Sequence, residues 1–176
     1  MNHGLKGREI VQDVDGFTDN TKSAAELGEL LRKNSLTVSC AESCTGGLLT
    51  GCLTEIAGSS EYVAGSVVSY TNAVKNKILG VKQSTLDEYG AVSEHTAREM
   101  AEGVRALIGS DIGIGVTGNA GPGASENKPV GLVYISVAGR KGTVVRENIF
   151  SGNRAVVRQK AVSTALAMIK EYIAGV

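Results

Sequence analysis

The stretch SCAESCTGG, residues 39–47, gathers several reactive groups within nine positions: two thiols, a carboxylate, hydroxyl groups and two adjacent glycines. An apolar run precedes it and apolar residues at helical spacing follow it, which predicts a turn between a strand and a helix. The backbone N–H groups of such a turn can bind a phosphate, or can hold an oxyanion beside a nucleophile. A helix start capped by Ser or Thr, without any chemistry, is the alternative interpretation.

Three side chains of this turn, Ser43, Cys44 and Thr45, could act as a nucleophile, and composition alone does not choose among them. A nucleophilic hydroxyl needs a nearby base. Neither histidine is well placed for that task, because His3 lies in a segment without periodicity and His95 lies in the first turn of a predicted helix. No serine–histidine–aspartate triad is therefore indicated.

A lysine kept neutral by burial is the remaining kind of base for a hydroxyl nucleophile. Lys75 and Lys77 follow the next predicted strand, early in a short helix. Because the turns after parallel strands of one sheet meet at the same edge, this segment can reach the turn at residue 43. Most lysines are solvated surface groups, which is the alternative for both residues.

Two other motifs are set aside on their context. The thiols Cys40, Cys44 and Cys52 are odd in number and lack zinc-ligand spacing, so we expect neither a disulfide framework nor a metal site. The segment GIGVTG, residues 113–118, matches the glycine pattern of dinucleotide-binding folds, but no helix begins after it. We expect its first two glycines to let a helix pack closely on a strand.

The glycine-rich loop that follows, residues 118–129, is predicted to contact a ligand.

The composition indicates a soluble globular chain without a bulk charge that would attract nucleic acid or a membrane. Of 176 residues, 42% are hydrophobic and 20% charged, with 18 basic and 18 acidic side chains. The N-terminal residues contain no apolar signal-peptide core, and no apolar run is long enough to span a bilayer. We therefore expect a cytoplasmic protein with a small-molecule partner, no nucleic acid or membrane partner, and assembly into a homo-oligomer.

Alternating strand and helix patterns predict a three-layer α/β/α sandwich with a mixed, mostly parallel sheet of about five strands and a late antiparallel hairpin. Residues 1–22 are predicted to be a tail or arm, and residues 23–176 a single domain. A capping box of Ser23 and Glu26 is expected to start the first helix. Strands are predicted at 36–40, 62–70, 111–118, 131–139 and 142–150, and helices at 23–34, 48–56, 71–80, 93–109 and through 162–173.

Six blocks of this sequence, in order, resemble the competence-damage-inducible C-terminal domain family, over roughly residues 23–173. They are AESCTGG, AGSSEYVAGSVVSYTNAVKNKILGV, GAVSEHTAREMAEG, VTGNAGPG, KPVGLVY and FSGNRAVVRQKA. The enzymatic members of that family are nicotinamide-nucleotide amidohydrolases, which convert nicotinamide mononucleotide to nicotinate mononucleotide and ammonia. The chain is similar to the free-standing form, without the additional domain that some members carry in front.

The resemblance implies a serine–lysine mechanism without metal or cofactor, in which Ser43 attacks the carboxamide, Lys75 accepts its proton and Tyr70 supports them. Backbone N–H groups around Cys44 and Thr45 would hold the oxyanion. The implied substrate-binding residues are Cys44, Thr45, Gly46, Thr117, Gly118, Asn119, Gly121 and Arg154.

Within that set, Arg154 is expected to bind the 5′-phosphate, because guanidinium binds phosphate with two hydrogen bonds; a surface arginine is the alternative. Asn119 departs from the family pattern, where an apolar residue is usual, and could alter substrate fit. A non-catalytic nucleotide-binding or interaction module is the alternative function.

Overall fold

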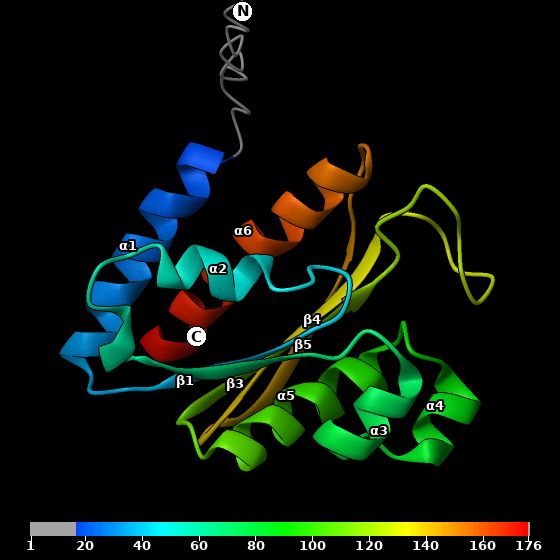
Figure 1. Ribbon diagram of the computed structural model, residues 1–176, viewed down its shortest axis with the longest axis horizontal. Coiled ribbons are helices and arrows are strands. Elements are labelled where there is room, and N and C mark those ends of the chain that lie inside the picture. Colours follow the sequence, from blue (N-terminus) through cyan, green and yellow to red (C-terminus); the bar gives the residue numbers. More distant parts are fainter. Residues whose placement is uncertain (1–16, 176) are drawn as a thin grey trace, which may run out of the picture.

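The computed structural model describes residues 17–175, which form one five-stranded sheet covered by helices on both faces (Figure 1). The strands are β1 (Val38–Glu42), β2 (Val63–Val68), β3 (Ile112–Gly118), β4 (Leu132–Gly139) and β5 (Gly142–Ile149). The helices are α1 (Phe17–Lys33), α2 (Leu48–Thr54), α3 (Asn72–Leu79), α4 (Gln83–Tyr89), α5 (Glu94–Ile108) and α6 (Arg154–Ala174), with a 3-10 turn, η1, at Ser59–Glu61.

The sheet has the strand order β2-β1-β3-β4-β5. The first three strands in this order are parallel, and β4 and β5 are antiparallel to their neighbours. Helices α1, α2 and α6 cover one face, and α3, α4 and α5 cover the other (Figure 1). The predicted three-layer sandwich with a mixed sheet and a late hairpin is confirmed.

Glycines in β3 allow α5 to lie directly on the sheet. A Cβ atom added to Gly113 would come within 2.2 Å of the carbonyl oxygen of Ala101, and one added to Gly115 within 2.4 Å of that of Ala97. Both carbonyls belong to α5. The expectation that these glycines allow a helix to pack closely on the strand is therefore confirmed.

The first helix begins earlier than predicted. Helix α1 starts at Phe17, so Ser23 lies within it and does not cap it, and residues 17–22 are not part of a tail. The cause is a tertiary contact: the side-chain amide of Asn20 donates a hydrogen bond of 2.8 Å to Gln159 of α6. The predicted tail at residues 1–16 lies outside the described residues.

Strands β1 and β2 end level with each other, and β3 continues two residues further to Gly118; this arrangement positions the candidate site. Glu42, the last residue of β1, is in register with Val68 of β2 and Val116 of β3. The residues that follow these positions therefore emerge side by side at one edge of the sheet. None of the helices in the described part of the chain has the length and apolar character needed to cross a membrane.

Candidate active site

The turn after β1 is built around a buried carboxylate. Glu42 is fully buried, and its carboxylate accepts hydrogen bonds from the backbone N–H groups of Gly47, Leu49 and Thr50, at 2.9, 3.1 and 2.8 Å. The hydroxyl of Thr50 donates a fourth hydrogen bond of 2.6 Å. An anion at a helix N-terminus is electrostatically favourable. Because the chain's own carboxylate occupies the N–H groups of Gly47, Leu49 and Thr50, these groups are not available to a phosphate.

Ser43 lies between this capped helix and a buried lysine. The amine of Lys75 is 2.9 Å from the Ser43 hydroxyl oxygen and donates a 2.7 Å hydrogen bond to the carbonyl oxygen of Ser69. Only 1% of Lys75 is exposed. Helix α3 carries this lysine and is capped at its N-terminus by Thr71, whose hydroxyl accepts a hydrogen bond from the backbone N–H of Val74.

Burial changes the chemistry of the lysine. Desolvation of the charged form lowers the pKa of Lys75 from 10.5 to about 8, against the raising effects of Cys44 and Glu126. A substantial fraction of the amine is thus neutral near pH 8. A neutral amine can donate to the Ser69 carbonyl and still accept the proton of the Ser43 hydroxyl through its lone pair. Lys77, the other candidate base, is exposed on the same helix.

The other two possible nucleophiles of the turn have different surroundings. Burial raises the pKa of the Cys44 thiol to about 11, so the thiol stays protonated at neutral pH. Thr45 is fully buried, and its hydroxyl has no hydrogen-bond partner in the described part of the chain. Neither side chain contacts Lys75 through a hydrogen bond, whereas Ser43 does. Of the three side chains, Ser43 is the one that the structure places beside the buried amine.

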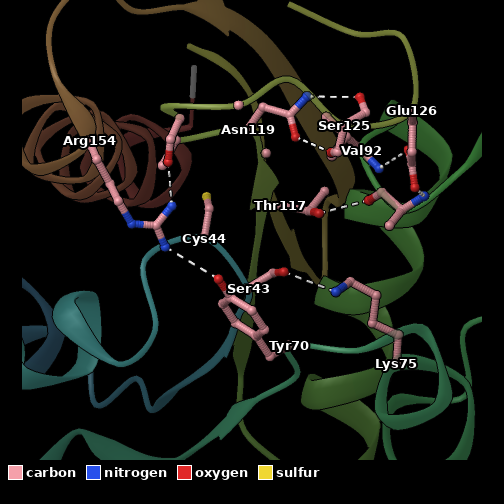
Figure 2. Close-up of a pocket in the computed structure, with 15 residues that line it drawn as sticks. Ser43, Cys44, Tyr70, Lys75, Val92, Thr117, Asn119, Ser125, Glu126 and Arg154 are labelled. Carbon is pink, nitrogen blue, oxygen red and sulfur yellow. Dashed lines mark hydrogen bonds between the residues drawn. The ribbon is translucent and has the colours of Figure 1, made fainter. Parts of the chain in front are cut away.

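Ser43 and Lys75 open into a cavity of about 260 Å³ at the carboxyl edge of the parallel strands (Figure 2). The cavity brings together most of the residues singled out from the sequence: Ser43, Cys44, Tyr70, Lys75, Thr117, Gly118, Asn119, Gly121 and Arg154. It does not include Thr45 or Gly46. Gly46 lies on the outside of the turn with a positive φ of 58°, beside the guanidinium of Arg158. The predicted substrate contact is therefore not supported for the Thr45 side chain or for Gly46.

Asn119 shapes the loop that forms one wall of the cavity. Its amide group donates to the carbonyl oxygens of Ser125 and Lys128, both at 3.1 Å, and its oxygen accepts from the Ser125 hydroxyl. These hydrogen bonds brace the loop internally. Asn119 also lines the cavity, so both a structural and a ligand-contact role fit its position.

A second contact ties the same loop to the start of α5. The carboxylate of Glu126 accepts hydrogen bonds from the backbone N–H groups of Ala91 and Val92, at 2.9 and 3.1 Å. Lys128 donates to the carbonyl oxygens of Tyr89 and Val92, at 2.5 and 2.8 Å. The hydroxyl of Thr117 donates to Ala91 as well, at 2.7 Å. The loop is therefore fastened to residues 89–92, of which Ala91 and Val92 also line the cavity.

Arg154 borders the cavity on the side away from Lys75 (Figure 2). Its guanidinium donates to the carbonyl oxygen of Gly121 at 2.7 Å and to the Tyr70 hydroxyl at 3.2 Å. These bonds use two of the five N–H donors of a guanidinium, so donors remain for an anionic ligand. Tyr70 is 62% exposed and contacts Arg154, not Ser43 or Lys75, through its hydroxyl. A direct part in proton transfer is not supported for Tyr70 by this geometry.

Sequence reasoning missed four residues that build the site: Glu42, Glu126, Lys128 and Arg158. Arg158 donates to the carbonyl oxygens of Cys44 and Thr45, at 3.1 and 2.7 Å, and so fixes the turn from α6. A charged residue at the end of an otherwise apolar strand was the available signal for Glu42. No local pattern marks the other three, because their partners lie far away in the sequence.

Comparison with known proteins agrees with the fold and shows the family. The model of the CinA C-terminal domain matches residues 20–173. The chain belongs to the CinA C-terminal domain family. It is 48% identical over 168 residues to a CinA-like protein of Endomicrobium trichonymphae. The aligned region covers 95% of this chain and 39% of that protein.

Solved structures of CinA proteins have the same fold. The competence/damage inducible protein CihA from Agrobacterium tumefaciens superposes with a TM-score of 0.84 and 42% identity, covering 87% of this chain and 94% of that one. A CinA superfamily protein from Escherichia coli gives a TM-score of 0.85 and 33% identity, covering 93% and 95%. The chain spans about two fifths of the length of the curated relatives it matches.

Proposed function

We propose that this CinA-family chain hydrolyses the carboxamide of nicotinamide mononucleotide to nicotinate mononucleotide and ammonia. The observation that carries the proposal is the 2.9 Å contact between the Lys75 amine and the Ser43 hydroxyl inside a cavity. A hydroxyl beside an amine whose pKa is lowered to about 8 is an activated nucleophile for acyl transfer. The choice of nicotinamide mononucleotide as the substrate comes from the family resemblance.

The proposed reaction has two halves. In the first, neutral Lys75 takes the proton of Ser43 as the serine oxygen bonds to the carboxamide carbon. The C–N bond then breaks, and the protonated Lys75 gives its proton to the departing amine, which leaves as ammonia. In the second, water attacks the acyl-enzyme ester, passes one proton to the serine oxygen through Lys75, and releases the carboxylate product.

The oxyanion formed on the carbonyl oxygen needs hydrogen-bond donors near Ser43. Glu42 already binds the N–H groups of Gly47, Leu49 and Thr50, so these do not serve. We assign the task to backbone N–H groups around Cys44 and Thr45. Arg158 supports this assignment indirectly, because it holds the carbonyl groups of those two residues in one orientation.

Substrate binding is assigned from the charges of the cavity. Arg154 is proposed to bind the 5′-phosphate, because it retains free donors and lies across the cavity from Lys75 (Figure 2). A cytoplasmic location, a homo-oligomer, and the absence of a nucleic acid or membrane partner remain proposals from the sequence. The relatives are named after competence and damage and not after an enzymatic activity. A non-catalytic nucleotide-binding module is therefore the second candidate.

The test is ammonia release from nicotinamide mononucleotide by the purified protein, with a chelator present and no added metal. We expect stoichiometric ammonia and nicotinate mononucleotide from the wild type. If the protein binds the nucleotide in calorimetry but releases no ammonia, with or without added divalent metal, the binding-module function is correct and the amidase proposal is wrong.

A further inference from the structure

The cavity contains one acidic side chain that the proposed mechanism does not use. Of the fifteen residues that line it, three belong to the charged residue types Lys, Arg, Asp and Glu. They are Lys75, Glu126 and Arg154. Lys75 acts in its neutral form, and Arg154 is assigned to phosphate. This leaves the Glu126 carboxylate as the one acidic group facing a bound ligand.

The carboxylate of Glu126 is held in its ionised form. Partial burial raises its pKa, but the hydrogen bonds from the backbone N–H groups of Ala91 and Val92, together with Lys128, outweigh burial, so the pKa of Glu126 is lowered overall. Both N–H groups belong to residues that line the cavity. The negative charge is therefore fixed in position at the cavity wall.

Lys128 pairs with Glu126 but does not itself line the cavity. Its amine is 3.4 Å from one carboxylate oxygen of Glu126, and it donates to the carbonyl oxygens of Tyr89 and Val92. Lys128 is not among the residues that line the cavity, whereas Glu126 is. Of this ion pair, the Glu126 carboxylate is therefore the member that borders a bound ligand.

The positions of the charges match the charges of a pyridinium nucleotide. Glu126 and Arg154 lie on opposite sides of the cavity, with Ser43 between them (Figure 2). A carboxamide held at Ser43 brings with it the ring to which it is attached, and in nicotinamide mononucleotide that ring carries the positive charge. The phosphate, at the other end of the molecule, then points toward Arg154.

We propose that Glu126 recognises the positive charge of the substrate's pyridinium ring, so that the site selects N-substituted, cationic nicotinamides over neutral ones. This inference rests on the proposed function. It predicts that the reduced nucleotide, whose dihydropyridine ring is neutral while its carboxamide, ribose and phosphate are unchanged, binds more weakly than the oxidised form. At the intermediate dielectric of a partly buried site, the attraction between opposite charges is strong enough to change the affinity about tenfold or more.

The experiment measures binding of nicotinamide mononucleotide and of its reduced form by calorimetry, in a Ser43→Ala background that prevents turnover. We expect Glu126→Gln in that background to weaken binding of the oxidised nucleotide about tenfold and to leave binding of the reduced nucleotide nearly unchanged. Glu88→Gln is the matched control: it removes the same charge from an exposed position of α4 outside the cavity, and should change neither affinity.

The two ligands separate charge recognition from loop damage. Loss of the Glu126 hydrogen bonds to Ala91 and Val92 would disturb the wall for both nucleotides alike, so an equal loss for both would overturn the inference. That result, with ammonia still released by the wild type, would leave the proposed function standing. If the wild type releases no ammonia and neither nucleotide binds, the proposed function fails and the inference fails with it.

Discussion

At the scale of single residues, the site depends on a lysine that the fold keeps out of water. Lys75 forms its two hydrogen bonds with Ser43 and with the Ser69 carbonyl, both inside the protein. Desolvation is the largest influence on its pKa, and no hydrogen bond to a carboxylate offsets it. Burial of Lys75 therefore lowers the stability of the fold, and it also lowers the pKa of the amine into the range that a proton acceptor needs.

The lowered pKa of Lys75 predicts a pH profile. Because the amine must be neutral to accept the serine proton, kcat/KM for nicotinamide mononucleotide should rise about tenfold per pH unit below pH 8 and level off above a pKa of about 8. An ordinary lysine would put that midpoint near 10.5. A profile that is flat between pH 6 and pH 9 would contradict a role for Lys75 as base.

The same shift predicts that removing the amine stabilises the fold. Between about pH 8 and 10.5 the unfolded chain binds a proton at Lys75 that the folded chain does not, so the wild type gains stability from this group as the pH rises. Lys75→Met should raise the free energy of unfolding at pH 7 by up to about 3 kcal/mol, less what the lost hydrogen bonds contribute.

Urea denaturation at pH 7 and at pH 10 checks this. The advantage of Lys75→Met should be largest below pH 8 and should shrink toward pH 10.5. Lys77→Met, an exposed position on the same helix, is the control and should show no such dependence. A Lys75→Met variant that is less stable than the wild type at pH 7 would show that its hydrogen bonds outweigh desolvation.

At the scale of elements, the site requires α3 to lie close against α5. A Cβ atom added to Gly103 of α5 would come within 1.8 Å of the carbonyl oxygen of Leu79, the last residue of α3. Backbone cannot move aside as a flexible side chain can, so α3 and its Lys75 would have to shift.

Gly103→Ala is therefore predicted to lower the free energy of unfolding by about 2 kcal/mol and to reduce ammonia release in whatever fraction folds. Gly51→Ala in α2 is the matched control, because nothing lies within 4 Å of its Cβ position. That variant should be neutral or gain up to about 1 kcal/mol from helix propensity. Equal thermal stability of the two variants would show that the α3–α5 contact does not fix the site.

Several elements could be predicted from periodicity, and their meeting point from topology. The run around Ser43 and the segment holding Lys75 both follow parallel strands, so their approach followed from the sheet. The start of α1 could not be predicted in the same way, because residues 17–22 are stabilised by the contact of Asn20 with Gln159, 139 positions away. The residues around Asn20 give no indication of a partner so far away in the sequence.

At the scale of the whole molecule, two helical layers enclose the sheet and leave its carboxyl edge to hold the cavity (Figure 1). Residues from 42 to 158 converge there, and the supporting charges Glu42, Glu126 and Arg158 each act on backbone groups. This explains why they escaped sequence reasoning: their roles depend on where main-chain N–H and C=O groups point. The resemblance pointed to Ser43 and Lys75 as the proposed reacting pair, and the fold shows what holds these two side chains in place.

The most direct test of the central claim is a double-mutant cycle at Ser43 and Lys75. It measures kcat/KM for ammonia release from nicotinamide mononucleotide in the wild type, Ser43→Ala, Lys75→Ala and the double variant. If the two side chains act as one unit, each single change should reduce kcat/KM about a thousandfold or more, and the double variant should be no worse than the singles. Modest losses that multiply in the double variant would contradict a serine–lysine pair.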